Sequence, residues 1–248
     1  MTDVLNIDWS RVGKKWVAYF DLLGFGDFVS NHPPESVFAL YETCIEVFKH
    51  QEKHVPELEY VHFSDTFLIY ARNDSAGSFA AIDMVSRWFV NHLIHRQIPL
   101  RGALACDDFY ADKSRSIFLG KALVEASKLG ERYNWIGFVL CPSAVERMGA
   151  INLPVDERLN FMRWEAPLKV ATQVEHRKER AVAYLIGASS TVNGQNIYAQ
   201  VLEEIAGRLE KAEIKAKYTN TLQFLNHFGV SQPVTKMDER AHLAERMP

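Results

Sequence analysis

The sequence predicts an α+β fold built around one mixed β-sheet. Short apolar runs rich in strand-forming residues alternate with longer segments whose apolar residues recur every three or four positions, as on one face of a helix. The chain has 248 residues, more than one average domain and fewer than two large ones, so we expect one core with additions. Its composition, 48% hydrophobic and 24% charged, is that of a folded protein and excludes intrinsic disorder.

The first half of the chain follows the order strand, helix, strand, strand, helix. Apolar runs that end at turn residues predict the strands, and two consecutive prolines favour the start of the first helix. The expected elements are a strand at Trp16–Asp21, a helix over about 35–52, strands at Leu58–Ser64 and Thr66–Ala71, and a helix with an apolar stripe from Phe79 to Phe89.

The second half adds further strands and two amphipathic helices. The expected elements are a strand from Pro99 through Leu104, a short strand at Ile117–Leu119, a helix over Gly120–Glu131, a strand at Gly137–Cys141, a peripheral hairpin of Phe161–Val170 and Ala181–Ile186 with the charged loop Glu175–Arg180, and a C-terminal helix striped by Ile197, Val201, Ile205 and Leu209. We therefore expect a core over residues 1–190 and a helical extension over residues 191–248, packed on the core or at a dimer interface.

The order β-α-β-β-α-β is that of a ferredoxin-like sheet, in which the first strand lies between the third and the fourth and runs antiparallel to both. The end of the first strand then lies beside the turn between strands two and three and beside the start of strand four. This topology predicts that Asp21, Asp65 and Arg101 converge at one edge of the sheet.

Two carboxylates at one sheet edge suit Mg²⁺ or Mn²⁺ when the phosphates of a nucleotide supply further oxygen ligands. The segment Leu23-Gly24-Phe25-Gly26 follows the first acid, and its two glycines allow backbone N–H groups to approach phosphate oxygens closely. The sequence therefore predicts phosphoryl chemistry at this edge, with Leu23, Gly24, Phe25 and Gly26 as phosphate-binding residues.

Three blocks of sequence resemble the class III nucleotidyl cyclases over roughly residues 15–187. Tyr19-Phe20-Asp21-Leu22-Leu23-Gly24-Phe25 is similar to the family's F-x-D-I-x-G-F motif, and Phe63-Ser64-Asp65-Thr66-Phe67-Leu68 is similar to its G-D-x-F-L hairpin. The segment from Leu119 to Leu129 is similar to its W-G-x-x-V-N-x-A-x-R-L helix. The resemblance implies a ferredoxin-like core of the class III nucleotidyl cyclase type.

The resemblance also implies a homodimer with composite sites. It implies two Mg²⁺ or Mn²⁺ ions per site held by Asp21 and Asp65, with Leu22 as a further metal-binding position. Arg101, Lys128 and Lys169 are the candidates for offsetting charge on the phosphates: Arg101 and Lys128 as catalytic residues, and Lys169 near the family's phosphate-binding lysine.

The positions that read the base differ from those of purine cyclases. Val61 and Ile117 stand where adenylyl and guanylyl cyclases place polar residues, and Val124 and Lys128 stand at the family's asparagine and arginine positions. This pattern resembles the bacterial pyrimidine cyclases of anti-phage defence (Pycsar). It implies conversion of UTP to 3′,5′-cyclic UMP, which activates a separate effector. Tyr60, Val61, Ile117 and Arg101 are the candidate base-binding residues.

Other properties of the chain narrow its class. The net charge of −3 does not favour a nucleic-acid partner, and the three cysteines indicate neither a disulfide framework nor a cysteine zinc site. The sequence contains no apolar run long enough to span a membrane, so we expect a cytoplasmic protein. Open alternatives are a cytidylate cyclase, a purine or diguanylate cyclase, and a catalytically silent nucleotide-binding module.

Overall fold

The computed structural model describes residues 12–156, 161–169, 178–184, 191–192 and 195–229. Parts of several sequence-based expectations lie outside these residues: the N-terminal segment 1–11, the end of the expected strand at Val170, residues 175–177 of the charged loop, Ile186, and residues 230–248 of the C-terminal extension.

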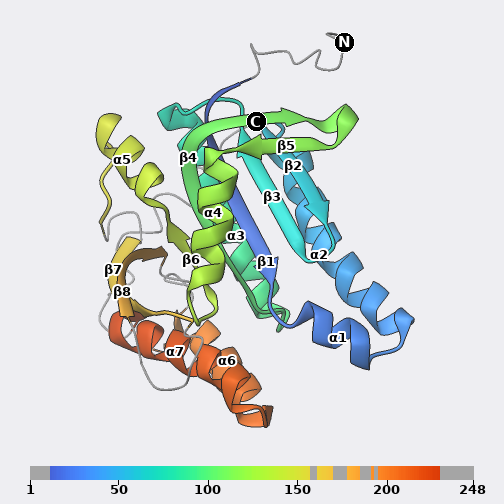
Figure 1. The fold of residues 1–248 in the computed structure, drawn as a ribbon. Helices are drawn as coiled ribbons and strands as arrows, with labels where there is room; N and C mark the ends of the chain where they lie inside the picture. The colour runs from blue at the N-terminus through green and yellow to red at the C-terminus, as the bar shows by residue number, and fades with distance from the viewer. Residues whose placement is uncertain (1–11, 157–160, 170–177, 185–190, 193–194, 230–248) are drawn as a thin grey trace.

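The elements follow the expected order, with additions (Figure 1). The strands are β1 (Gly13–Leu22), β2 (Leu58–Phe63), β3 (Thr66–Ala71), β4 (Leu100–Asp112), β5 (Ile117–Gly120), β6 (Gly137–Leu140), β7 (Phe161–Pro167), β8 (Lys178–Tyr184), β9 (Thr191–Val192) and β10 (Gln195–Asn196). The helices are α1 (Phe25–Asn31), α2 (Pro34–His54), α3 (Ala76–His95), the 3₁₀ turn η2 (Lys113–Arg115), α4 (Lys121–Arg132), α5 (Pro142–Ala150), α6 (Ile197–Arg208) and α7 (Ala212–Gly229).

The main sheet has the strand order β2-β3-β1-β4-β6-β8-β7, and β5 pairs with the far end of β4. Strand β1 lies between β3 and β4 and is antiparallel to both, as the ferredoxin-like topology predicts. Its register pairs Asp21 with Thr66 on one side and with Arg101 on the other. The fold class expected from the sequence is therefore confirmed.

The two faces of the sheet are covered by different helices, because successive side chains of a strand point to opposite faces. Trp16 and Phe20 pack against the rings of Phe79 and Phe89 on α3, with centroids 5.0 and 5.1 Å apart. Tyr19, between them in sequence, points to the other face and donates a hydrogen bond to Glu131 on α4. Helices α2 and α3 thus cover one face, and α4 lies across the other (Figure 1).

The C-terminal helices pack on the core. Thr221 on α7 is fully buried: its hydroxyl accepts a hydrogen bond from the Ile136 N–H at 2.8 Å and lies 2.9 Å from the Ile136 carbonyl. Phe224, one helical turn later, is also buried and contacts the rings of Trp135 and Trp164. These contacts fix α7 against the loop between α4 and β6.

Several boundaries differ from those expected. Strand β4 continues to Asp112 instead of ending at Leu104, because it pairs with β1 over its first part and with β5 over its last. Residues 178–180, expected in a loop, belong to β8. Helices α1 and α5 were not expected: α1 is short, and α5 owes much of its burial to tertiary contacts that no local pattern records. Helix α7 lies in the extension that was expected to be helical, beyond the one helix whose apolar stripe the sequence shows.

Candidate active site

Asp21, Asp65 and Arg101 meet at one end of the central strands, as the topology predicts. Asp21 is the penultimate residue of β1, and Arg101 faces it across the antiparallel pair with β4. The turn between β2 and β3 is tied to the same place, because the backbone N–H of Leu22 donates to the Asp65 carbonyl oxygen at 2.9 Å. Ser64 in this turn has a φ of 53°, which allows the tight reversal that presents Asp65.

Arg101 holds the Asp21 carboxylate. Its Nε and Nη2 atoms lie 2.8 and 2.7 Å from the same oxygen, Oδ2. Its Nη1 donates to the backbone carbonyl of Glu131 at the end of α4, at 3.2 Å. The two side chains are only 9% and 14% exposed, so this is a nearly buried, charge-assisted pair. The arginine therefore links β1, β4 and α4 at the edge of the sheet.

The protonation of Asp21 reflects competing influences. Burial raises the pKa of the Asp21 carboxyl, because a charged group loses solvation in the interior, and the neighbouring Asp65 and Glu131 raise it as well. The charge and hydrogen bonds of Arg101 lower it, but burial is the largest cause, and the pKa remains above its ordinary value. A bound cation would stabilise the ionised form of Asp21, because nearby positive charge lowers the pKa of a carboxyl group.

Glu131 is a third acid near Asp21, besides Asp65. Glu131 Oε1 accepts a hydrogen bond from the Tyr19 hydroxyl at 2.9 Å. Burial is the main reason why the pKa of Tyr19 lies well above its ordinary value, so the phenol remains protonated. The contact anchors the end of α4 to β1, beside the Asp21–Arg101 pair.

The charges of this pair affect the pKa values of two lysines, of which the sequence pointed only to Lys169. The pKa of Lys169 is lowered by burial and by the charges of Arg101 and Lys217, whereas Glu131 and Asp21 raise it. The pKa of Lys217 on α7 is lowered by burial and by Arg101 and raised by Asp21 and Asp27. The negative charge of Asp21 thus favours the charged forms of Lys169 and Lys217, and Arg101 contacts Asp21 directly. No motif marks Lys217, because its position depends on how α7 docks.

The glycine segment after Asp21 departs from the prediction at one residue. Gly24 has a φ of 78°, in the left-handed region that favours glycine, and it precedes α1. A side chain at Gly24 or Gly26 would meet no atom within 4 Å, so the backbone here is open. The N–H of Leu23, however, donates to the Pro99 carbonyl at 2.9 Å and is not free for a phosphate. Phosphate binding by the backbone N–H groups of Phe25 and Gly26 stays a prediction.

The predicted base-binding residues do not all lie together. Tyr60 is 6% exposed and packs edge-on to Phe48 in the core, on the side of the sheet opposite to its neighbour Val61. Arg101 is engaged by Asp21 and Glu131. Tyr60 and Arg101 are therefore withdrawn as candidates for contact with a base. Val61 and Ile117 are partly exposed on β2 and β5, where such contact remains a prediction.

Lys128 lies apart from the residues that face the sheet. Helix α4 packs its small residues Ala122, Ala126 and Gly130 against the strands. Lys128 is exposed, as is Val124 one turn earlier, with 50% of its surface accessible. A role for Lys128 in phosphate chemistry therefore requires a site that approaches this exposed face of α4.

The acids suit a divalent cation. Both contacts of Arg101 use Oδ2 of Asp21, and within the described residues no hydrogen bond engages Oδ1 or the Asp65 carboxylate. The same part of the chain contains no group of three or more His, Cys, Asp or Glu side chains that would enclose an ion. The site therefore fits a cation that takes its remaining ligands from a bound substrate, as Mg²⁺ does with nucleotide phosphates.

Comparison with solved structures identifies the fold. The chain is similar to the catalytic core of a rhodopsin-guanylyl cyclase with converted specificity in complex with ATPαS, with a TM-score of 0.50 and 12% identity over 70% of this chain and 96% of that one. It is also similar to the adenylyl cyclase CyaB from P. aeruginosa (TM-score 0.47, 10% identity, 70% and 94% covered) and to the guanylate cyclase domain of RhGC from Catenaria anguillulae in complex with GTP (0.47, 11%, 69% and 96%).

No family model matches the sequence, and no curated protein does. At these identities the likeness concerns the fold, which is that of a class III nucleotidyl cyclase catalytic domain. None of the described helices is long and apolar enough to cross a membrane.

Proposed function

We propose that this protein is a nucleotidyl cyclase that converts a pyrimidine nucleoside triphosphate, UTP in the first instance, into its 3′,5′-cyclic monophosphate and pyrophosphate. The observation that carries the proposal is the convergence of Asp21, Asp65 and Arg101 at the end of β1. The charges of Asp21 and Arg101 also affect the pKa values of Lys169 and Lys217. Phosphoryl transfer depends on positioning and on the stabilisation of phosphate charge, and these side chains supply both.

Asp21 and Asp65 would hold two Mg²⁺ or Mn²⁺ ions together with the substrate's phosphates. When bound, such ions supply Lewis-acid stabilisation of the phosphate oxygens and of the attacking oxygen. In the reaction the bond between the ribose 3′-oxygen and the α-phosphorus would form, the bond from that phosphorus to the leaving pyrophosphate would break, and the proton of the 3′-hydroxyl would pass to water.

The chain's own residues have separate tasks. Arg101 is a positioning residue, since it fixes the rotamer of Asp21 through two hydrogen bonds to one oxygen and ties it to α4. Lys169 and Lys217 offset the negative charge of the triphosphate and of the departing pyrophosphate. Phe25 and Gly26, at the open start of α1, would turn their N–H groups to the same phosphates.

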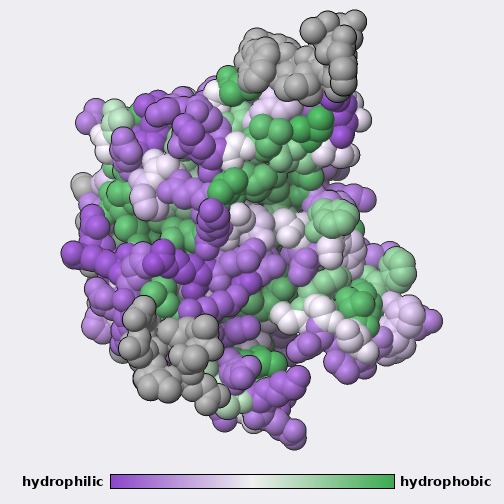
Figure 2. Space-filling view, viewed as in Figure 1, coloured by the Kyte–Doolittle hydropathy of each residue, from purple (hydrophilic) through white to green (hydrophobic). Residues whose placement is uncertain are grey.

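The site is completed in a homodimer. Lys128 is exposed on the face of α4 that does not pack on the sheet, so it would act on a substrate bound by the partner subunit. Exposed apolar residues on the same side support an interface there, since Leu119 on β5 is 54% and Val124 on α4 is 50% exposed. Figure 2 shows apolar surface over β5 and the strands beside it. A two-fold axis would then create two equivalent sites.

The preference for a small base rests on Val61 and Ile117. These side chains offer no hydrogen bond to the edges of adenine or guanine, so a purine would lose its bonds to water without replacement. The choice of uracil over cytosine has lost one support, because Arg101 is committed to Asp21. Because the chain resembles the pyrimidine cyclases of defence systems, we expect its product to activate a separate effector.

The test is incubation of the protein with each of the four NTPs and Mn²⁺, followed by mass identification of the product. Cyclic UMP as the main product is expected. Cyclic CMP would correct only the base, and cyclic AMP or GMP would overturn the pyrimidine assignment. Nucleotide binding without any product would favour a catalytically silent module, the alternative that Val124 at the family's asparagine position supports.

A further inference from the structure

Phe63 is a large aromatic residue that the fold leaves in solvent. It is the last residue of β2, the strand at one edge of the main sheet, and 82% of its surface is exposed. Within the described part of the chain no other large apolar side chain is as exposed. A single exposed apolar residue is ordinary in proteins, so its meaning depends on what lies beside it. Asp65 follows two residues later, in the turn after β2.

The strand register places Phe63 on the face of the sheet that carries Asp21. Phe63 pairs with Thr66 on β3, and Thr66 pairs with Asp21 on β1. Residues directly opposite each other on antiparallel strands share a face, so the three side chains form one row across three strands. At about 4.8 Å between neighbouring strands, Phe63 and Asp21 are roughly 10 Å apart. The aromatic side chain is therefore within reach of a nucleotide whose phosphates lie at Asp21.

The row is covered on one side of Asp21 and open on the other. Towards β4 it continues to Arg101, whose guanidinium contacts Asp21 and the Glu131 carbonyl at the end of α4. Helix α4 thus bounds the row in that direction. Towards the edge of the sheet the row passes Thr66, which is partly exposed, and ends at Phe63. A nucleotide with its phosphates at Asp21 therefore finds open surface for its base on the Phe63 side.

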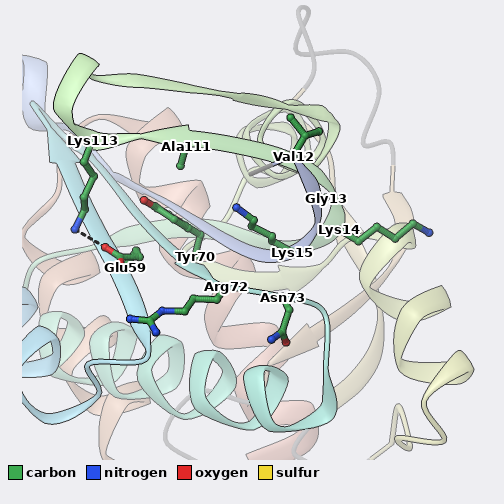
Figure 3. Close-up of a pocket in the computed structure, with 10 residues that line it drawn as sticks. All are labelled: Val12, Gly13, Lys14, Lys15, Glu59, Tyr70, Arg72, Asn73, Ala111 and Lys113. Carbon is green, nitrogen blue, oxygen red and sulfur yellow. Dashed lines mark ion pairs between the residues drawn. The ribbon is translucent and has the colours of Figure 1, made fainter. Parts of the chain in front are cut away.

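The other side chains on this face of β2 are an ion-paired glutamate and a valine. Alternate residues of a strand share a face, so Glu59 and Val61 lie on the same face as Phe63. Glu59, near the start of the strand, is ion-paired with Lys113 at 2.7 Å (Figure 3). Val61 has no hydrogen-bonding group. This face therefore presents apolar surface to a base, and every base has a ring face that can stack on an aromatic side chain.

We propose that the base of the substrate stacks on the ring of Phe63, next to Val61. The inference rests on the nucleotide site proposed above and adds the residue that holds the base. Stacking covers an apolar ring that water otherwise surrounds, and it supplies affinity where Val61 and Ile117 supply no hydrogen bonds. Because a ring face contacts uracil and cytosine alike, Phe63 would set how tightly the base binds and not which pyrimidine is preferred.

Calorimetric titration with Mn²⁺ and 3′-deoxy-UTP tests the proposal, because this analogue lacks the attacking 3′-oxygen and remains intact. Inorganic tripolyphosphate is the second probe, since it carries the phosphates without a base. Phe63→Ala should weaken binding of 3′-deoxy-UTP by about fivefold or more, as the loss of a base–aromatic stack requires, and should leave tripolyphosphate binding unchanged. Phe63→Tyr keeps the ring and should bind as the wild type does. Phe63→Leu keeps only apolar volume and should bind nearly as weakly as Phe63→Ala.

Phe38→Ala is the matched control, because it removes a phenylalanine that is 68% exposed on α2, the helix that covers the opposite face of the sheet. It should leave the binding of both probes unchanged. The ratio of affinities for 3′-deoxy-UTP and 3′-deoxy-CTP should be the same in Phe63→Ala as in the wild type. Light scattering on each variant measures its oligomeric state.

Wild-type affinity for 3′-deoxy-UTP in Phe63→Ala or Phe63→Leu would overturn the proposal. A parallel loss of both probes with dissociation of the dimer would also overturn it, and would assign Phe63 to a contact between subunits. Cyclic UMP formation by the same proteins separates this inference from the proposed function. Product formed with an unchanged KM in Phe63→Ala would overturn the stacking contact alone, whereas ring-dependent binding without any product would overturn the cyclase activity alone. A wild-type protein that binds neither probe would overturn both.

Discussion

Two nitrogen atoms of Arg101 contact a single oxygen of Asp21: Nε lies 2.8 Å and Nη2 lies 2.7 Å from Oδ2. A third nitrogen reaches the Glu131 carbonyl, so one side chain fixes an acid on β1 to the end of α4. The acid proposed as a metal ligand is thereby held in one rotamer before a nucleotide arrives, which lowers the entropic cost of assembling the site.

The first prediction concerns this pair. Arg101→Met should lower the free energy of unfolding by about 3–5 kcal/mol at pH 7, because it leaves a nearly buried carboxylate without its partner. Since Arg101 lowers the pKa of Asp21, its loss raises that pKa further. Protonation of Asp21 then relieves the penalty, and the difference from wild type should shrink as the pH falls toward 4.

Urea unfolding at several pH values measures this effect. The control Arg208→Met removes the arginine of an exposed pair with Glu204, whose side chains are 63% and 55% exposed, and should cost less than about 1 kcal/mol. A loss in Arg101→Met as small as that of the control would show that the Asp21 pair contributes nothing to stability.

The second prediction separates the two acids. Asp21→Asn and Asp65→Asn should each abolish cyclic nucleotide formation, because each removes a carboxylate ligand at nearly constant volume. Their stabilities should differ: Asp21→Asn leaves the guanidinium of Arg101 buried beside a neutral group, whereas Asp65→Asn breaks no ion pair among the described residues. Product assays and thermal melting of both variants test this, and full activity in folded Asp65→Asn would remove that acid from the site.

The third prediction tests the shared site. Asp21→Asn and Lys128→Ala should each be inactive as homodimers. A two-fold dimer with one copy of each variant has one intact site of its two, and equal mixing makes about half of all dimers of this kind. The mixture should therefore regain up to about a quarter of wild-type activity. Activity of the mixture, measured after subunit exchange, is the readout. A chain that remains monomeric by light scattering at working concentration would contradict the composite site.

The sequence could predict the meeting of Asp21, Asp65 and Arg101, because strand order and direction alone bring these positions to one edge. It could not predict what Arg101 contacts there. A strand arginine beside a predicted phosphate site suggests a ligand contact, but the side chain binds the neighbouring buried carboxylate, which compensates its charge. The base contact expected of Tyr60 is unsupported for a related reason. Successive residues of a strand point to opposite faces of the sheet, and Tyr60 points into the core whereas Val61 does not.

Lys217 shows a different limit of sequence analysis. Its helix is amphipathic, but the docking of that helix depends on Thr221, which hydrogen-bonds to Ile136, and on Phe224 between Trp135 and Trp164. These partners are 60 to 90 residues away in the chain, and no spacing rule connects them. The length of β4 was missed for the same reason, since its residues after Leu104 pair with the start of β1 and its last four residues, Phe109–Asp112, pair with β5.

The fourth prediction concerns close packing behind the site. A Cβ atom at Gly102 would lie 2.1 Å from the Tyr19 carbonyl oxygen, so Gly102→Ala must displace β4 from β1. The displacement would move its neighbour Arg101 away from Asp21. We expect a loss of more than about 3 kcal/mol in stability, with loss of activity.

Gly149→Ala on α5 is the matched control, because a Cβ atom at Gly149 would meet no atom within 4 Å. It should be neutral or slightly stabilising in the same denaturation assay. Equal stability of the two variants would contradict the packing argument.

The fifth prediction concerns Lys217. Burial and Arg101 lower its pKa below the ordinary 10.5, so the folded protein holds this proton less tightly than the unfolded chain does. The unfolded state therefore binds more protons between the two pKa values, and the stability of the wild type rises with pH through that window. At pH values below the lowered pKa, Lys217 is charged in the folded protein, and the free energy of unfolding is reduced by the full cost of burying that charge. Lys217→Met should accordingly be more stable than wild type at pH 7, and its advantage should shrink as the pH approaches 10.5.

The same variant should lose activity, because the charge that is costly in the empty protein is favourable beside a triphosphate. We expect kcat/KM for the preferred NTP to fall by about 10- to 100-fold, within the range of a lost electrostatic contact in an active site. Lys215→Met is the control: it removes an exposed lysine from the same helix and should change neither property. Thermal melting from pH 6 to 10 and steady-state kinetics measure the two effects. A Lys217→Met protein that is less stable than wild type at pH 7, or that keeps full activity, would exclude Lys217 from the phosphate site.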